Sequence, residues 1–201
     1  MLYFEQFPVV FYSLDGGPPI LITNIMARTR IKQIVLDTAA VYYTYQIKES
    51  DTPEIIADKY YSDPNRYWII LATNMILNPF YDWPLTYNNF QNFIVGKYGS
   101  IATAQAQIDH YEKQIVSVDS VTSASTTKVF TIDYATYLAL PALEVDTYNL
   151  KNGASVTITI TKNAVTSYDY EHDLNEAKRT IKILDNSYVS QIEAELKAIF
   201  A

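Results

Sequence analysis

Histidines and carboxylates are the side chains of this 201-residue chain that could do chemistry, since cysteine is absent. The two histidines, His110 and His172, have no second histidine at metal-site spacing such as His-x-x-x-His. A zinc site would need three or four ligands, and without cysteine none of them can be a thiolate. We therefore predict no metal site and no cofactor, and we expect both histidines to be exposed on helices.

Acidic residues could form the carboxylate pair of a glycosidase, whose members need not be close in sequence. The candidates Asp51, Glu54 and Asp63 have another explanation, because each falls at the start of a predicted helix. Five scattered glycines do not form a phosphate-binding loop, and no Gly-x-Ser-x-Gly segment occurs. We predict that the chain is not an enzyme and has no small-molecule substrate.

Composition narrows the class of partner. A net charge of −7 argues against a surface that binds nucleic acid, and 49% hydrophobic with 18% charged residues suits a folded chain of one or two domains. No segment approaches the roughly 20 apolar residues of a membrane span, and the start lacks the basic residues of a signal peptide. We expect a soluble chain made in a reducing cytoplasm. The eighteen tyrosines suit either a protein interface or the rim of a core.

The clearest structural pattern begins at Val41, where Tyr43, Tyr45 and Ile47 alternate with polar residues as in a half-buried strand. A helix start follows at residues 50–54. Either Asp51 caps this helix with Glu54 at its third position, or Thr52 caps it with Pro53 at its first. The predicted apolar face of the helix contains Ile55, Ile56, Ala57 and Tyr60.

A second helix is predicted to begin at once, with Asp63 as its cap, and to end near Asn74. Two turns, Asn78-Pro79 and Trp83-Pro84, follow it. The helix and these turns carry an aromatic cluster that could be core, protein interface or a platform for sugar rings: Tyr67, Trp68, Phe80, Tyr81 and Trp83. Because Tyr67 and Trp68 are adjacent on a helix, they cannot face the core equally.

The remaining segments give weaker patterns. Residues 1–40 are predicted to form an extended arm, with a turn at Asp15–Pro19 and a short helical stretch capped by Thr23 or Asn24 and running to Arg28. Residues 86–97 and 101–114 are predicted as helices. A small antiparallel β unit follows, with a hairpin turn at Asn152-Gly153.

The last segment, residues 176–201, is predicted to start with a strand or helix at Ile181 and Ile183. A helix capped by Asn186 or Ser187 follows. Its apolar stripe is bordered by Phe200 and contains Val189, Ile192, Leu196 and Ile199.

Residues 43–61 resemble a LysM module, in which a strand leads through an Asp-Thr turn into two short helices packed on a two-stranded sheet. The segments SDPNRYWIILATN (62–74) and NPFYDWPLT (78–86), together with both chain ends, resemble the LysM-containing wedge protein of T-even-type contractile-tailed phage baseplates. Residues 116–167 match nothing in that family.

The resemblance implies an α+β fold with a LysM-like β-α-α-β module in residues 41–99. Residues 100–175 would then hold a helix and the β insertion. It also implies a structural role: six copies in the baseplate joining neighbouring wedges around the central hub, in contact with other wedge proteins and a sheath-initiator-like protein. The rival hypotheses are a LysM module that binds peptidoglycan and a hydrolase targeted by such a module.

Overall fold

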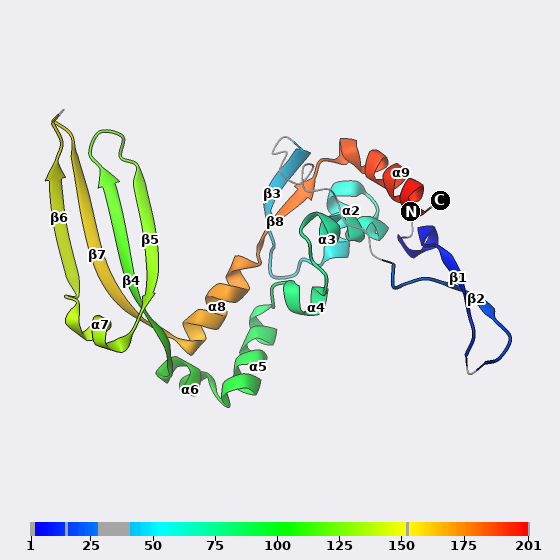
Figure 1. The fold of residues 1–201 in the computed structure, drawn as a ribbon, viewed down its shortest axis with the longest axis horizontal. Coiled ribbons are helices and arrows are strands. Elements are labelled where there is room, and N and C mark those ends of the chain that lie inside the picture. The colour runs from blue at the N-terminus through cyan, green and yellow to red at the C-terminus, as the bar shows by residue number, and fades with distance from the viewer. Residues whose placement is uncertain (1–2, 15, 28–40, 152, 201) are drawn as a thin grey trace. The chain divides into compact units, whose positions relative to one another are not determined.

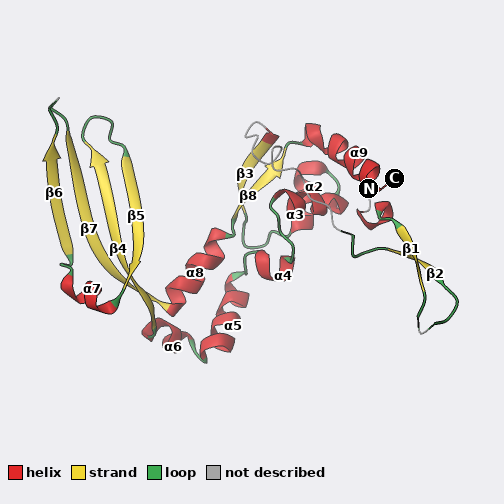
Figure 2. Ribbon diagram, viewed as in Figure 1, coloured by secondary structure: helices red, strands yellow, loops and turns green. Residues whose placement is uncertain are grey.

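The protein is described here by a computed structural model that covers residues 3–14, 16–27, 41–151 and 153–200. The fold is of mixed α and β class (Figure 2). Two compact units make it up, Met1–Thr86 with Asn175–Ala201, and Tyr87–Leu174. Three residues used in the predictions, Asp15, Arg28 and Asn152, lie outside the described part, as does the side chain of Phe200.

The first unit is discontinuous in sequence, because its last elements follow the second unit (Figure 1). Its elements are η1 (Tyr3–Gln6), β1 (Val9–Tyr12), β2 (Ile20–Thr23), β3 (Tyr42–Gln46), α2 (Pro53–Tyr61), η3 (Pro64–Arg66), α3 (Tyr67–Thr73), α4 (Pro79–Asp82), β8 (Thr180–Leu184), η4 (Asn186–Tyr188) and α9 (Val189–Phe200).

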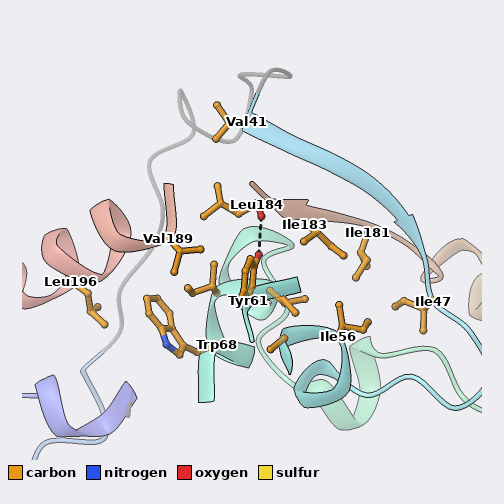
Figure 3. Close-up of a cluster of buried hydrophobic side chains, with 13 residues drawn as sticks. Val41, Ile47, Ile56, Tyr61, Trp68, Ile181, Ile183, Leu184, Val189 and Leu196 are labelled. Atoms are coloured by element: carbon orange, nitrogen blue, oxygen red, sulfur yellow. Dashed lines mark hydrogen bonds between the residues drawn. The ribbon is translucent and has the colours of Figure 1, made fainter. Parts of the chain in front are cut away.

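A two-stranded antiparallel sheet of β3 and β8 forms one layer of this unit, in a register from Tyr42 opposite Leu184 to Gln46 opposite Thr180. The core between this sheet and helices α2, α3 and α9 is apolar (Figure 3). Its buried members are Val41, Ile47, Ile56, Ala57, Tyr61, Trp68, Ile69, Ile70, Ile181, Ile183, Leu184, Val189 and Leu196. The strand predicted around Tyr43 therefore forms its sheet with a strand from near the other end of the sequence.

Helix α2 begins at Thr52, whose side chain accepts a hydrogen bond from the Ile55 amide, with Pro53 in the first helical position. It ends at Ser62, which adopts a left-handed conformation with φ 52°. Ile56 is fully buried, whereas Ile55 is 51% exposed. The predicted apolar face was therefore wrong at Ile55, because the core-facing stripe runs through Ile56, Ala57 and Tyr61.

In the predicted N-terminal arm, residues 9–23 form a hairpin, so the extended segment around Ile20–Ile22 is a strand. Strands β1 and β2 pair antiparallel, with Phe11 opposite Leu21. Residues 24–27 form a turn in which Asn24 accepts from the Met26 amide, so the predicted helical stretch is absent from them. Two short runs of apolar and β-branched residues, Val9–Tyr12 and Ile20–Thr23, lie on the two sides of the turn and favour strand pairing.

The second unit contains α5 (Tyr87–Tyr98), α6 (Ile101–Ala106), β4 (Ile108–Asp119), β5 (Ser125–Ile132), α7 (Tyr134–Ala139), β6 (Leu143–Asn149), β7 (Ser155–Thr166) and α8 (Ser167–Ala177, which runs into the first unit at Asn175). Its sheet is fully antiparallel, in the order β5-β4-β7-β6. Gly153 has a φ of 82° in the β6–β7 turn, the left-handed conformation that the predicted hairpin requires.

The helix predicted over residues 101–114 was wrong in its second half. Helix α6 ends at Ala106, and Ile108 already belongs to β4. Residues 108–114 pair with β7 on one side, and from Tyr111 onward β4 also pairs with β5. Residues 108–114 are therefore a strand because their hydrogen bonds go to distant strands, which a local helical pattern does not reveal.

At the chain end, the predicted caps Asn186 and Ser187 were wrong. Asp185 occupies the capping position, and its carboxylate accepts from the backbone amide and hydroxyl of Ser187. A 3-10 turn, η4, separates this cap from α9. Along α9, Val189 and Leu196 are buried but Ile199 is 62% exposed, so the predicted stripe faces the core only in part.

Candidate protein interface

The turn before α2, residues 48–51, is closed by hydrogen bonds to the side chain of Asp51. The Asp51 carboxylate accepts hydrogen bonds from the Tyr45 hydroxyl (2.6 Å) and the Lys48 amide (2.9 Å). Asp51 therefore closes this turn and does not cap α2, which corrects its predicted role. Burial and the bond to Asp51 raise the pKa of Tyr45 to about 12. Burial alone would raise the pKa of the Asp51 carboxyl. The hydrogen bonds from Tyr45 and from the Lys48 amide outweigh burial, so this pKa is lowered.

The other predicted cap lies between the two helices. Asp63 caps η3 and accepts from the Asn65 amide at 2.9 Å, so the second helical segment begins with a 3-10 turn. The backbone hydrogen bond from Asn65 lowers the pKa of Asp63. Arg66, at the end of this turn, donates to both Glu193 oxygens and to the Tyr61 carbonyl. The 3-10 turn η3 and helix α9 are thus joined by a charged pair.

The aromatic cluster divides into a buried and an exposed part. Trp68 is 5% exposed and belongs to the core, while Tyr67 and Trp83 are partly buried against it. The Trp83 indole donates to the Asp51 carbonyl at 3.1 Å. Phe80 and Tyr81, in contrast, are 88% and 75% exposed. The sequence placed all five aromatics together but could not separate core from surface.

Helix α4 exposes Phe80 and Tyr81, and three side chains form hydrogen bonds with the backbone of residues 77–81. The Asn78 side chain accepts from the Phe80 amide, and the Asp82 carboxylate accepts from the Leu77 and Asn78 amides. Lys178 donates to the Tyr81 carbonyl at 2.7 Å. Two exposed rings on a fixed backbone lose little conformational entropy on binding, which is the property of an interface anchor.

A shallow hollow lies beside α4. It has a volume of about 310 Å³ and is lined by Asn74, Met75, Ile76, Leu77, Asp82, Lys178, Thr180 and Ile181. Met75 and Leu77 at its rim are 52% and 78% exposed. The sequence analysis did not single out these two side chains, although an apolar run directly before an Asn-Pro turn could have indicated them.

The β1–β2 hairpin is a second exposed apolar surface of this unit. All eight of its strand residues are exposed. Phe11 is 78% and Leu21 58% exposed although they lie opposite each other in the ladder. A two-stranded hairpin is at best marginally stable in water by itself. This surface is therefore suited to be covered by another protein.

The two histidines, which the sequence analysis considered as metal ligands, lie in the second unit. His110 is on β4, not on a helix as predicted, and its ring nitrogens contact Asp109 (2.9 Å) and Glu112 (3.1 Å). These bonds raise the pKa of His110. His172 is on α8, near Asp173 at 3.5 Å. Within the described ranges, no group of three or more His, Cys, Asp or Glu side chains could hold a metal ion.

Glu171 on α8 is a buried carboxylate, the type of group that can act as a general acid or base. It accepts hydrogen bonds from Lys97 and from the Tyr98 hydroxyl, both at the end of α5. The contact with Glu171 raises the pKa of Lys97. These three groups tie α8 to α5.

None of the helices in the described ranges is long and apolar enough to span a bilayer.

Comparison with known proteins identifies the family of the chain. Residues 10–199 match the model of the family described as Base plate wedge protein 53, so the chain belongs to that family of structural baseplate proteins. It is also similar to the baseplate wedge protein gp53 of Enterobacteria phage T4. The two are 32% identical over 62 residues, which cover 31% of this chain and 32% of that relative. The alignment thus spans about a third of the curated relative's length.

Proposed function

We propose that this protein is a non-catalytic component of a phage tail baseplate wedge that joins neighbouring wedge subunits around the central hub. The observation that carries the proposal is the pair Phe80 and Tyr81, exposed on a rigid α4 in a chain whose residues 10–199 match the wedge family. Its partners would be other wedge proteins, a sheath-initiator-like protein and the hub. Each baseplate of the contractile tail would contain six copies, and it would be assembled in the host cytoplasm.

The module that presents these rings is proposed to be LysM-like. The order β3-α2-α3-β8, with the two strands antiparallel, supports a β-α-α-β unit. The second strand comes from residues 180–184, so this module would extend beyond residues 41–99. The remaining elements, β1–β2 and α9, would then reach neighbouring subunits.

Wedge assembly from purified proteins of the same phage tests this role. Replacing both Phe80 and Tyr81 by alanine should weaken incorporation at least tenfold, because aromatic anchors are typical hot spots. Melting of the isolated variant should be unchanged, because neither ring is in the core. Tyr134→Ala, which truncates an exposed tyrosine of the second unit, is the matched control. Normal incorporation of the double variant would contradict the assigned anchors.

Peptidoglycan binding is the second candidate, favoured by exposed rings beside a hollow that also has polar lining. Aromatic faces can stack on sugars as well as on proteins. A pull-down with purified peptidoglycan separates the two. Retention that is lost in the Phe80 and Tyr81 double variant, together with normal wedge assembly, would favour the cell wall. Trp68→Ala is unsuitable here because Trp68 is buried and its loss would damage the core.

A further inference from the structure

The sheet of the second unit has two uncovered edges. Strands β5 and β6 are its outer strands, and every residue of β6 and all but the last of β5 are exposed. In the described part of the chain, no strand pairs with the outer side of either one. An edge strand has unpaired N–H and C=O groups along its length, and these can pair with a further strand.

The two edges run in opposite directions. Each neighbouring pair in the order β5-β4-β7-β6 is antiparallel, and an even number of such strands leaves the outer two antiparallel to each other. If a second copy is placed beside the first in the same orientation, its β6 lies antiparallel to β5. The combined sheet then continues the pattern of the isolated one.

The hydrogen-bonding groups also match in this arrangement. In an antiparallel ladder, residues alternate row by row between pairs that exchange hydrogen bonds and pairs that do not. Across four strands this alternation makes the outward-facing groups of β5 and β6 fall in the same rows. The register shift in the β4–β7 ladder lies at Ile108/His110, outside the rows in question.

Charge fixes the same register. Lys128 on β5 and Glu144 on β6 occupy one row, through Ile115 and Ile160. An unshifted second copy therefore brings its Glu144 directly opposite Lys128 on one face of the sheet. Its Asp146 lies two residues further along the same face, within reach of a long side chain.

The uncharged rows agree with this arrangement. On the other face of the sheet, Val129 meets Leu143, and Thr127 meets Val145. Val129, Leu143 and Val145 are each more than half exposed in the single chain, so the pairing would bury apolar surface. Both faces of the contact are thus complementary.

Pairing of like edges is disfavoured. Two β6 strands paired around Val145 would place Glu144 opposite Asp146, and two β5 strands paired around Lys128 would place lysines opposite each other. Like charges directly opposite destabilise a ladder. We propose that β5 of one copy pairs head-to-tail with β6 of a second copy of this chain, with Lys128 opposite Glu144. Contacts of this heterologous kind form rings when the rotation closes.

Engineered disulfides in the full chain test the contact, because the protein has no cysteine of its own. Directly opposite residues on paired strands are within disulfide range. Under mild oxidation, the variant with both Thr127→Cys and Val145→Cys should form a ladder of covalent multimers. The variant with Thr127→Cys and Thr147→Cys, displaced by two residues, should give at least fivefold less.

Charge variants in this cysteine background test the register. Lys128→Glu or Glu144→Lys should each lower the multimer yield about fivefold, because an opposite pair becomes a like pair. The combined exchange should restore it. Lys113→Glu, the same change on the inner strand β4, is the control and should leave the yield unchanged.

Three results would overturn the proposal. Covalent dimers from either single-cysteine variant would show like edges pairing, and equal yields from the direct and displaced pairs would show no defined register. A folded protein, checked by circular dichroism, that forms no multimers would assign Lys128 the opposite role of a charge that blocks edge pairing. Only this chain is present in the experiment, so its outcome is independent of the wedge role.

Discussion

The hydroxyl of Tyr61 donates a hydrogen bond to the Leu184 carbonyl (3.1 Å) inside the core of the first unit, where Tyr61 is 2% exposed (Figure 3). Tyr61→Phe leaves that carbonyl without this donor, so we expect a loss of about 1–3 kcal/mol of unfolding free energy. Urea unfolding measures it. Tyr81→Phe, on an exposed ring, is the control and should change little; equal effects would contradict the assigned bond.

The carboxylate of Asp185, directly after the last residue of β8, makes the stability of the fold depend on pH in acid. Hydrogen bonds from the Ser187 hydroxyl, the Tyr43 hydroxyl and the Ser187 amide lower the pKa of Asp185 from 3.8 to about 2. Because the folded state holds this proton more weakly than the unfolded chain, the contribution is complete above about pH 4 and is lost as pH falls toward about 2.

The Asp185→Asn variant should lack that part of the pH dependence. Thermal unfolding followed between about pH 2 and pH 5 should show a shallower acid loss than in the unchanged protein. Asp173→Asn, whose side chain is 81% exposed, is the control and should keep the original slope. A parallel loss in the Asp185 variant would show that other carboxylates dominate acid unfolding.

At the scale of the element, α2 offers a matched pair of adjacent isoleucines. Ile56 is fully buried and Ile55 is 51% exposed. Ile56→Ala should cost about 2–5 kcal/mol of unfolding free energy through lost burial and the cavity left behind. Ile55→Ala should stay within about 0.5 kcal/mol. Denaturant titration distinguishes them, and similar losses would mean that α2 is rotated from its assigned orientation.

At the scale of the whole molecule, the second unit is inserted into the first between two segments that are hydrogen-bonded to each other. The Leu85 amide donates to the Asn175 side-chain oxygen at 2.7 Å, and the Asn175 side-chain nitrogen donates back to the Leu85 carbonyl at 3.2 Å. The chain therefore leaves the first unit and returns to it at neighbouring positions, as inserted domains commonly do.

We expect residues 1–86 joined to 175–201 by a short Gly-Ser linker to fold alone, because every member of the first unit's core cluster is retained. Cooperative thermal melting by circular dichroism is the measurement. The control is a chain that ends at residue 174, which lacks β8 and should leave this unit unfolded. Loss of cooperativity in the linked protein would show that the second unit is needed for folding.

Local chemistry explains what the sequence determined by itself. Thr52-Pro53 and Asp63-Pro64 mark two helix starts, and Gly153 marks a hairpin turn, because caps and turns involve atoms only a few residues apart. The aromatic cluster and the resemblance to the wedge family were also visible at this level.

Tertiary structure decided the rest. The partner of β3 is β8, more than 130 residues away, and no local pattern identifies a partner at that distance. The same cause turns residues 108–114 into a strand, since their hydrogen bonds go to β7 and β5. Burial likewise separates Ile56 from Ile55, because which side of a helix faces the core depends on the surface against which it packs. Trp68 and Phe80 differ in burial because α3 packs into the core and α4 exposes both of its aromatic rings.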